Sequence, residues 1–434
     1  MAAVTIPNAG TYDLLVDTGY SVDAFTLDNP VRGVLDDPFY VLDGTTNFAS
    51  VAEGTLNVSM KRGRADENDA ITNGTMSFTL NDTLADGVFN PFDDDPTNPY
   101  YDLAQGVPGL APGRAVQLIR YDNSNTAELL FVGFVVNYDY KFTLGGLDTV
   151  TVFCVDNMYR LAQTFIPGQN PSKEFTGDRI EWVLDLPQVD YPTGAARDIA
   201  PGTVELGGSG QYSIPNGTNV KAYFDDITYS AERGRIFIDR EGVLVSQDRI
   251  GFVIGPAVAD FRDDGTGIPY RDLSIAFRAE DIINLVSIKP NGGSAQVASD
   301  TPSQNTYFIK SLFITDSLLE NNSDALALAN YLLYPEPLPR FDSLETWFGS
   351  LTASQRDTTA VLELGDYVTI EKDILIGGSP SPLGQDLSIE GVEHRIDFAA
   401  GHSVRIYTSP ATPVFDLLLD DPVYGRLDEN NVLG

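Results

Sequence analysis

The sequence predicts a mainly β fold with an α+β insert, and three observations lead to this prediction. Residues 55–156 contain runs in which apolar and polar residues alternate with the period of a half-buried strand. From about residue 157 the apolar spacing becomes helical, and beyond about residue 340 the strand-like alternation returns. The expected order along the chain is therefore β, α+β, β, with an extended arm at each end.

The first β region is expected over residues 55–160. It begins after an N-terminal arm that spans residues 1–54, and its strands are predicted at 55–60, 75–80, 114–121, 129–136 and 148–155. A Pro/Asp-rich excursion over 90–101 interrupts them. Several short strands separated by turn residues are typical of a small barrel or a sandwich.

The central α+β region is expected over residues 161–305. A first helix is predicted over 176–186 and a second over 219–232, where Gly234 supplies the break after the helix. The second helix leads directly into a hairpin over 235–245, whose turn lies at 239–242. Strands are also expected at 272–277 and 284–289, followed by a Gly/Ser/Asn-rich loop or crossing segment over 290–305.

The second β region is expected over residues 306–414, and the C-terminal arm over 415–434. A short helix at 325–333 ends before Pro335, because the residues that precede a proline are disfavoured in helices. The strands that follow are predicted at 361–364, 367–370, 387–394 and 403–407.

The charge of the chain is strongly acidic. The 434 residues include 62 Asp and Glu against 27 Lys and Arg, which gives a formal net charge of −35. Such a surface repels nucleic acid, which suits a protein past which DNA must slide, although solubility or a salty habitat explains the charge equally well. Since no basic leader and no apolar run of membrane-spanning length is found, we expect a soluble protein made in a cytoplasm.

Residues that could carry catalysis or bind metals are scarce. Cys154 is the only cysteine and lies in an apolar strand pattern, where an inert buried thiol is expected. His394 and His402 are the only histidines, so neither a zinc site nor a Ser-His-Asp set is predicted. We therefore predict no catalytic residue, no cofactor and no metal site. Calcium at the Asp-rich segments 93–95 and 263–265 stays an open alternative to solvated loops.

A repeated strip stands near both ends of the chain. Residues 27–36, LDNPVRGVLD, and residues 419–428, LDDPVYGRLD, are identical at seven of ten positions. Proline and glycine bend each strip, and its apolar residues need another surface to be buried. The alternative is that both strips are solvated termini. We predict that both arms dock on a neighbouring protein through Leu27, Pro30, Val31, Leu35, Leu419, Pro422, Val423, Tyr424 and Leu427.

Four short motifs stand along the chain. Residues 231–245, AERGRIFIDREGVLV, followed by Arg249, resemble the AExGxxFxDxxG…R stretch common in minor tail proteins of long-tailed actinobacterial phages. The segments Pro112-Gly113-Arg114 and Leu364-Gly365-Asp366 resemble the openings of the family's two barrels, and the strip at 419–428 is similar to its C-terminal end. Together these matches span roughly residues 55–434.

The resemblance implies a tail hub, akin to the baseplate hub of T-even phages. Two tube-type barrels of one chain would flank the central domain, so that a homotrimer presents six barrels to the hexameric tail tube or distal tail protein. Other tail-tip or fibre proteins would be further partners, and DNA would pass without specific binding and without any membrane contact. The expected location is the tail tip of the virion, and the chain is expected to be made in the host cytoplasm.

Two functions from different classes follow from these observations. The first is a structural, non-enzymatic hub that connects the tail tube to the tip and lines the DNA exit channel. The alternative is a tail protein that binds or degrades host-wall carbohydrate, for which the 20 tyrosines and 23 phenylalanines could form sugar platforms. The chain carries no appended hydrolase region of the kind found in more divergent hubs, and this disfavours a lytic role.

Overall fold

The computed structural model describes residues 3–17, 48–248, 256–411, 415–416 and 431–432, apart from residues 68, 84, 86 and 338 and several positions between 91 and 109. The predicted docking residues at 27–35 and 419–427 lie outside these described residues. Within the described residues, no helix is long and apolar enough to span a membrane.

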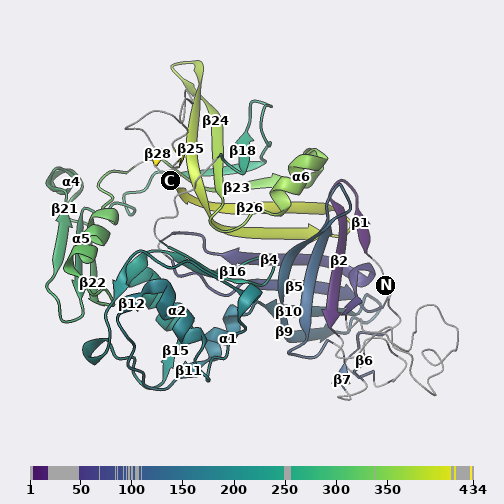
Figure 1. Cartoon of the computed structure of the whole chain (residues 1–434). Coiled ribbons are helices and arrows are strands. Elements are labelled where there is room, and N and C mark those ends of the chain that lie inside the picture. Colours follow the sequence, from purple (N-terminus) through teal and green to yellow (C-terminus); the bar gives the residue numbers. More distant parts are fainter. Residues whose placement is uncertain are drawn as a thin grey trace.

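The dominant element is one curled sheet of 14 strands (Figure 1). Its main path runs in the order β1-β2-β8-β9-β10-β5-β4-β25-β26-β23-β19, while β3 joins β2, β24 joins β25 and β18 joins β24. The strands are β1 (Val4–Ile6), β2 (Gly10–Asp17), β3 (Phe48–Ser50), β4 (Thr55–Gly63), β5 (Thr75–Asn81), β8 (Ala115–Tyr121), β9 (Ala127–Lys141), β10 (Thr149–Val155), β18 (Ala259–Arg262), β19 (Asp272–Ala276), β23 (Arg340–Trp347), β24 (Tyr367–Ile376), β25 (Ser379–Asp397) and β26 (Gly401–Pro410).

The two β regions of the sequence meet within this sheet. β4 pairs antiparallel with β25 from Gly63↔Gly391 to Asn57↔Asp397, so strands more than 300 residues apart are direct neighbours. Buried side chains of β4 and β25, such as Met60 and Ile396, belong to one common core. The alternation read from the sequence is present in the strands, but both regions contribute to a single sheet and a single core.

A second core belongs to the α+β unit. It is built around α1 (Met158–Gln163), α2 (Thr176–Leu184), α3 (Val220–Ile227) with its π-helical continuation η4 (Thr228–Glu232), and α5 (Asn322–Tyr331). Strands β16 (Arg235–Ile238) and β17 (Leu244–Gln247) form the predicted hairpin, with β13 (Arg197–Ile199) parallel to β17. A further sheet has the order β21-β20-β22, formed by β21 (Gln296–Ser299), β20 (Leu285–Pro290) and β22 (Ser311–Ser317).

The remaining elements are short. Strand pairs are formed by β6 (Tyr101–Asp102) and β7 (Val107–Pro108), β11 (Phe165–Ile166) and β15 (Thr218–Asn219), β12 (Glu174–Phe175) and β14 (Glu205–Leu206), and β27 (Phe415–Asp416) and β28 (Asn431–Val432). Two further α-helices are α4 (Thr301–Tyr307) and α6 (Ala353–Ala360). In the described part of the chain, four 3-10 turns complete the elements, namely η1 (Ala52–Gly54), η2 (Gly194–Ala196), η3 (Gly210–Tyr212) and η5 (Phe348–Ser350).

Three parts of the structure differ from the sequence expectations. Residues 4–17 form β1 and β2 of the large sheet, with Tyr12 and Leu14 fully buried, so the arm expected over 1–54 does not include them. The loop expected over 290–305 contains β21 and α4, which begins where Asp300 Oδ1 accepts the N–H of Ser303 at 2.7 Å. The strand expected at 361–364 is wrong, because these residues follow α6 in a turn.

The two cores also divide the chain at a different place from the expected boundary at 305/306. β22 and α5 lie beyond that boundary, yet Ile314 and Leu328 pack into the core of the α+β unit. β19 lies before the boundary and pairs with β23 of the large sheet. The reason is that a helix and a strand bury their apolar faces wherever a matching surface is available, which local sequence does not specify. The division into two tube-type barrel domains stays a prediction.

Candidate functional site

The candidate site is the joint between the large sheet and the α+β unit, and its centre is Glu390. The register of β25 against β26 shifts between Ile389 and Gly391, so Glu390 lies in a β-bulge. The bulge turns the carboxylate inward, and the residue is 1% exposed. A buried carboxylate at a bend of a 19-residue strand needs positive partners to remain charged.

Three elements supply those partners. Arg64, which follows β4, places Nη2 2.7 Å from Oε2 of Glu390, and Arg235 of β16 makes the second ion pair. The hydroxyl of Ser409 in β26 donates to Oε1 at 2.7 Å. Burial acts to raise the pKa of Glu390, but the two guanidinium groups outweigh it and hold the pKa at about 2. Glu390 thus ties the centre of the sheet to the first strand of the hairpin.

A second carboxylate, Glu363, extends the joint. It pairs with Arg62 of β4, and its Oε2 accepts the backbone N–H of Arg240 in the hairpin turn at 2.9 Å. Asp366 fixes this segment, since its Oδ2 accepts the N–H of Glu363 at 2.8 Å. Burial raises the pKa of Asp366 to about 6. The Leu364-Gly365-Asp366 motif therefore positions an anchor for the α+β unit.

The hairpin turn at 239–242 contacts the first β region. Asp239 Oδ1 accepts the N–H groups of Glu241 and Val243 at 2.9 and 2.8 Å, which closes the turn. Gly242 has φ of +89°, and a Cβ there would lie 3.1 Å from Cγ1 of Val132 in β9. Arg240 Nη1 donates to the carbonyl of Leu129, also in β9, at 3.1 Å. The hairpin turn thus contacts β9 as well as Glu363. It meets the Leu364-Gly365-Asp366 motif, more than 100 residues further along the chain, at one joint.

The third motif lies beside the joint. The N–H of Gly113 donates to the carbonyl of Val135 in β9 at 2.7 Å, and the N–H of Val135 donates to the carbonyl of Arg114 at 2.8 Å. The motif thus starts the pairing of β8 with β9, the strand that the hairpin turn touches. Such an arrangement of backbone contacts and ion pairs fixes the orientation of β9 relative to the hairpin.

Glu390 was not among the residues that the sequence analysis singled out. A signal for it was present, because the apolar residues Leu387 and Ile389 are two apart, whereas Ile389 and Val392 are three apart. Apolar residues three apart stay on the same face of a strand only if one extra residue is inserted between them relative to the partner strand. Such an insertion is a β-bulge. This spacing therefore marks Glu390 as a residue of the bulge.

The two histidines lie together in the core of the large sheet. His394 Nδ1 is 3.0 Å from His402 Nε2, and His402 Nδ1 is 2.7 Å from the hydroxyl oxygen of Tyr12. The Tyr12 hydroxyl also donates to the carbonyl of Ala9 at 3.3 Å. Because the Tyr12 hydroxyl donates to Ala9, it accepts from Nδ1–H of His402, and Nε2 of His402 in turn accepts from Nδ1–H of His394. The buried Nε2 of His394 then carries a lone pair that no described residue contacts. An unpaired lone pair costs less than an unpaired N–H.

The histidines and Asp156 should give opposite pH dependences. Burial lowers the pKa of His394 to about 3, so the stability that it contributes is complete above its ordinary pKa of 6.5 and is lost as the pH falls. Burial raises the pKa of Asp156 to about 7, so its contribution is complete below its ordinary pKa of 3.8 and is lost as the pH rises.

We therefore expect two variants to deviate from the wild type in opposite directions. Between about pH 5 and about pH 7, Asp156→Asn should make stability rise more steeply with pH, by up to about 1.4 kcal/mol per pH unit. His394→Leu should make it rise less steeply. Urea midpoints at several pH values measure both slopes, and two variant curves parallel to the wild type would contradict the assignment.

The outer face of the central strands is balanced in charge. Four charged residues of alternating sign form a row across these strands. Lys61 of β4 pairs with Glu393 of β25. Glu393 pairs with Arg405 of β26, and Arg405 pairs with Glu345 of β23. Arg405 and Glu345 form an ion pair at 2.6 Å. Cross-strand neighbours of opposite sign stabilise a sheet. The large acidic excess of the chain is therefore not gathered in this row.

The acidic segments considered for calcium are occupied by internal contacts. Asp263 pairs with Lys372 and accepts the N–H of Asp373 at 3.0 Å, while Asp264 Oδ1 accepts from Thr266. Asp93 accepts from the Asn98 side chain at 2.7 Å. Among the described residues, no group of three or more His, Cys, Asp or Glu could hold a metal ion. Cys154 is buried, and burial raises the pKa of its thiol.

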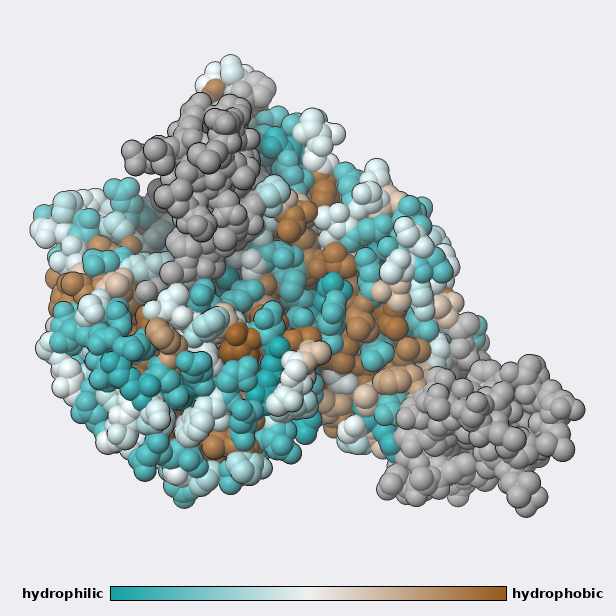
Figure 2. All heavy atoms as spheres, viewed as in Figure 1, coloured by the Kyte–Doolittle hydropathy of each residue, from teal (hydrophilic) through white to brown (hydrophobic). Residues whose placement is uncertain are grey.

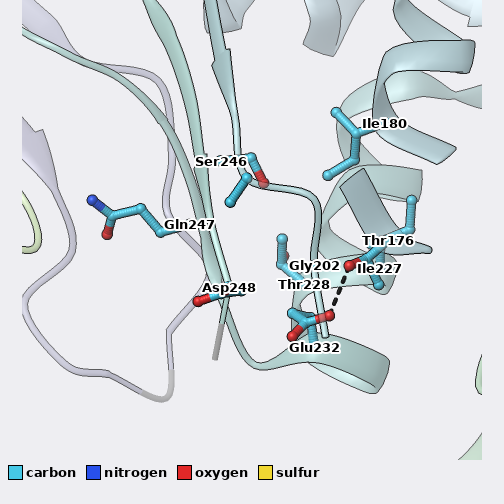
Figure 3. A pocket seen from close by; sticks show the side chains of 10 residues that line it. Thr176, Ile180, Gly202, Ile227, Thr228, Glu232, Ser246, Gln247 and Asp248 are labelled. Carbon is cyan, nitrogen blue, oxygen red and sulfur yellow. Dashed lines mark hydrogen bonds between the residues drawn. The ribbon is translucent and has the colours of Figure 1, made fainter. Parts of the chain in front are cut away.

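A small pocket opens between α2 and β17 (Figure 3). Its empty volume, open solvent included, is about 200 Å³. This volume is smaller than the roughly 300–1,000 Å³ of typical ligand sites. Glu232, the acidic residue of the AExG motif, lies at its edge and accepts from the Thr176 hydroxyl at 2.7 Å. Its oxygens also accept the N–H of Thr203 at 3.2 Å. In this pocket the motif glutamate therefore links α2 to η4.

Comparison with solved structures identifies the fold. The tail protein from Neisseria meningitidis MC58 superposes with a TM-score of 0.55 at 12% identity, covering 92% of this chain and 96% of that one. The 43 kDa tail protein of prophage MuSo2 from Shewanella oneidensis gives a TM-score of 0.51 at 13% identity, covering 85% and 94%. The chain shares its fold with phage tail proteins. No family model and no curated protein sequence matches it.

The tail-protein fold extends over nearly the whole chain, including the large sheet and the α+β unit that the joint connects. The expected resemblance to tail proteins is thus confirmed at the level of the fold. An actinobacterial host, the trimer and the partners stay predictions.

Proposed function

We propose that this chain is a structural, non-enzymatic hub protein of a phage tail tip, which connects the tail tube to the distal tip or fibres. The observation that carries the proposal is the fold shared with the Neisseria meningitidis tail protein over 92% of this chain. In this role, the two parts of the sheet on either side of the β4–β25 pairing serve as the two tube domains. A homotrimer then offers six such domains to a hexameric ring.

The joint supports this role, because a hub must hold its domains at a fixed angle. Glu390 and Glu363 link the sheet to the hairpin through Arg235 and the N–H of Arg240. Buried ion pairs fix geometry more effectively than they add stability. The same positions are where the sequence motifs converge.

The charge of the chain supports a channel that DNA crosses without specific binding. With a net charge of −35, the protein repels phosphates at long range, and the row from Lys61 to Glu345 offers DNA no gathered positive charge. An acidic lining of the channel stays a prediction, since it depends on which faces of the chain surround the channel.

The proposed function predicts a trimer. In mass photometry or light scattering at low micromolar concentration, we expect a species of three times the chain mass of 47.1 kDa. Addition of the neighbouring tail-tube protein should shift this species to a larger complex, because a hub is proposed to bind a hexameric ring. A control incubation with bacterial cell-wall polysaccharide should release no saccharide. A monomer that binds or cleaves the polysaccharide would overturn the proposal in favour of the carbohydrate-directed alternative.

A further inference from the structure

One face of the β21-β20-β22 sheet carries large apolar side chains that no described part of the chain covers, interspersed with serine and threonine. We call it the lobe face and define it by Val297, Phe313, Phe308 and Ile309, with Lys289 and Lys310 at its edges. Val297 of β21 and Phe313 of β22 both stand opposite Ser287 of β20, so the three form one row across the sheet. Val297 is 52% exposed and Phe313 is 63% exposed, although both lie on strands. The alternate residues, such as Val286 and Ile314, are buried in the core of the α+β unit.

The lobe face points away from the rest of the chain. α5 packs on the opposite side of the same sheet, where Leu328 shares a core with Val286, and α5 also contacts η4. In Figure 2, apolar residues gather at the edge of the molecule where Figure 1 places α5, β21 and β22. A surface with this orientation is accessible to a second molecule.

The loop before β22 holds two large apolar side chains in solvent. The backbone of Phe308 has φ of +63° and ψ of 172°, a conformation that residues other than glycine rarely adopt. The fully buried Asn284 holds it there, because its Nδ2 donates to the Phe308 carbonyl at 2.8 Å and its Oδ1 accepts the N–H of Lys310 at 2.8 Å. Phe308 and Ile309 are 83% and 64% exposed. Backbone strain retained in order to display a phenylalanine indicates a binding role.

The charges of the lobe face suit an acidic occupant. Lys289 and Lys310 are exposed and form no ion pair among the described residues. β22 itself carries one acidic residue, Asp316. The C-terminal strip, residues 416–429, combines the opposite charge with apolar residues: it reads DLLLDDPVYGRLDE and carries five acidic residues against one arginine. Its Leu, Val and Tyr residues need a surface such as this one.

The two ends of the strip lie side by side. Thr408 near the end of β26 donates to the carbonyl of Phe341 in β23 at 2.7 Å, and Asp416 of β27 pairs with Val432 of β28. The 14 residues from 417 to 430 can therefore project up to about 23 Å from that strand pair, which is half of their extended length. In a closed ring of copies, each strip would meet the same face of the next copy.

We propose that the lobe face is the docking surface for the C-terminal strip of a neighbouring copy of this chain. Phe308, Ile309 and Phe313 form the apolar seat, and the two lysines attract the acidic residues of the strip. This proposal deepens the hub role, because it names the contact that joins one subunit to the next.

Photo-crosslinking in the full chain tests this contact. A benzoylphenylalanine at Tyr424 should crosslink to peptides that contain residues 296–317. In a mixture of heavy-isotope and ordinary chains, we expect products that join one chain of each kind. Phe313→Ser should lower the crosslink yield about tenfold, because the strip would then bury a small polar side chain in place of the 63% exposed phenylalanine.

Matched variants separate the contributions. Leu375→Ser, at a position that is 77% exposed on β24, should leave the yield unchanged, whereas Lys289→Glu combined with Lys310→Glu should lower it, most strongly at low salt. Crosslinks to another surface, or only within one chain, would overturn the docking proposal. A trimer with such misplaced crosslinks would leave the hub role intact, and mixed crosslinks without a trimer would leave the docking contact intact.

Discussion

Replacing Glu390 by glutamine should destabilise both cores of the protein at once. The substitution keeps the size of the side chain but leaves Arg64 and Arg235 largely buried and without their counter-charge. Removing one partner of a buried ion pair typically costs about 3–5 kcal/mol. Because Arg235 belongs to the α+β unit and Glu390 to the sheet, the loss should affect the unfolding of each.

The two tryptophans allow this to be measured. Trp182 packs against the core of the α+β unit, and Trp347 belongs to β23 of the large sheet. With Trp182→Phe or Trp347→Phe as background, urea unfolding followed by fluorescence reports one core at a time. We expect Glu390→Gln to lower both midpoints. A shift of the Trp347 transition alone would show that the ion pairs do not couple the two cores.

A matched control is available at the same joint. Glu241 pairs with Arg240 at 3.1 Å, but its side chain is 53% exposed. Exposed ion pairs contribute about 0–1 kcal/mol. Glu241→Gln should therefore leave both midpoints almost unchanged, and a large effect there would point to net charge as the cause.

Replacing Gly63 by alanine should have the second large effect, and it should fall mainly on the sheet. Gly63 has φ of +82°, and a Cβ there would lie 2.2 Å from the carbonyl oxygen of Glu390 and 2.7 Å from Cα of Gly391. Neither backbone atom can withdraw without separating β4 from β25. Backbone strain and overpacking together should cost at least about 3 kcal/mol, which we expect to see in the Trp347 transition.

Gly113→Ala separates the two causes. Gly113 has a similar φ of +91°, but a Cβ there would meet nothing within 4 Å. Only the strain of the left-handed backbone remains, which costs about 1–2 kcal/mol. Equal losses of stability in the two variants would mean that the clash of the new methyl group with β25 adds nothing to the destabilisation by Gly63→Ala.

Local patterns predicted most of the elements correctly. The alternation at 55–60 and 75–80 corresponds to β4 and β5, and the helical spacing over 219–232 corresponds to α3 and η4. Periodicity works there because one side of each element is buried and the other is not. α6 was missed because it has no apolar stripe, and its signal is only the capping box of Thr352 with Gln355.

The candidate site was predictable only in fragments. The hairpin at 235–245 and the Leu364-Gly365-Asp366 segment were recognised as motifs, but nothing in their spacing indicates that Arg240 and Glu363 are hydrogen-bonded. The same limit applies to Tyr12 and His402, which are 390 residues apart. Contacts of this kind depend on how the sheet closes around its core, and each partner is locally an ordinary polar residue.

The local elements, the acidic charge and the resemblance to tail proteins are readable from the residues alone, because periodicity, composition and motifs are properties of neighbouring residues. That both β regions share one sheet, and that Glu390 anchors the α+β unit to it, is visible only in the folded chain. Strand pairing and the burial of charge join residues that are far apart in the sequence. The pairing of β4 with β25 is selected by the fit of whole surfaces, which no local pattern encodes.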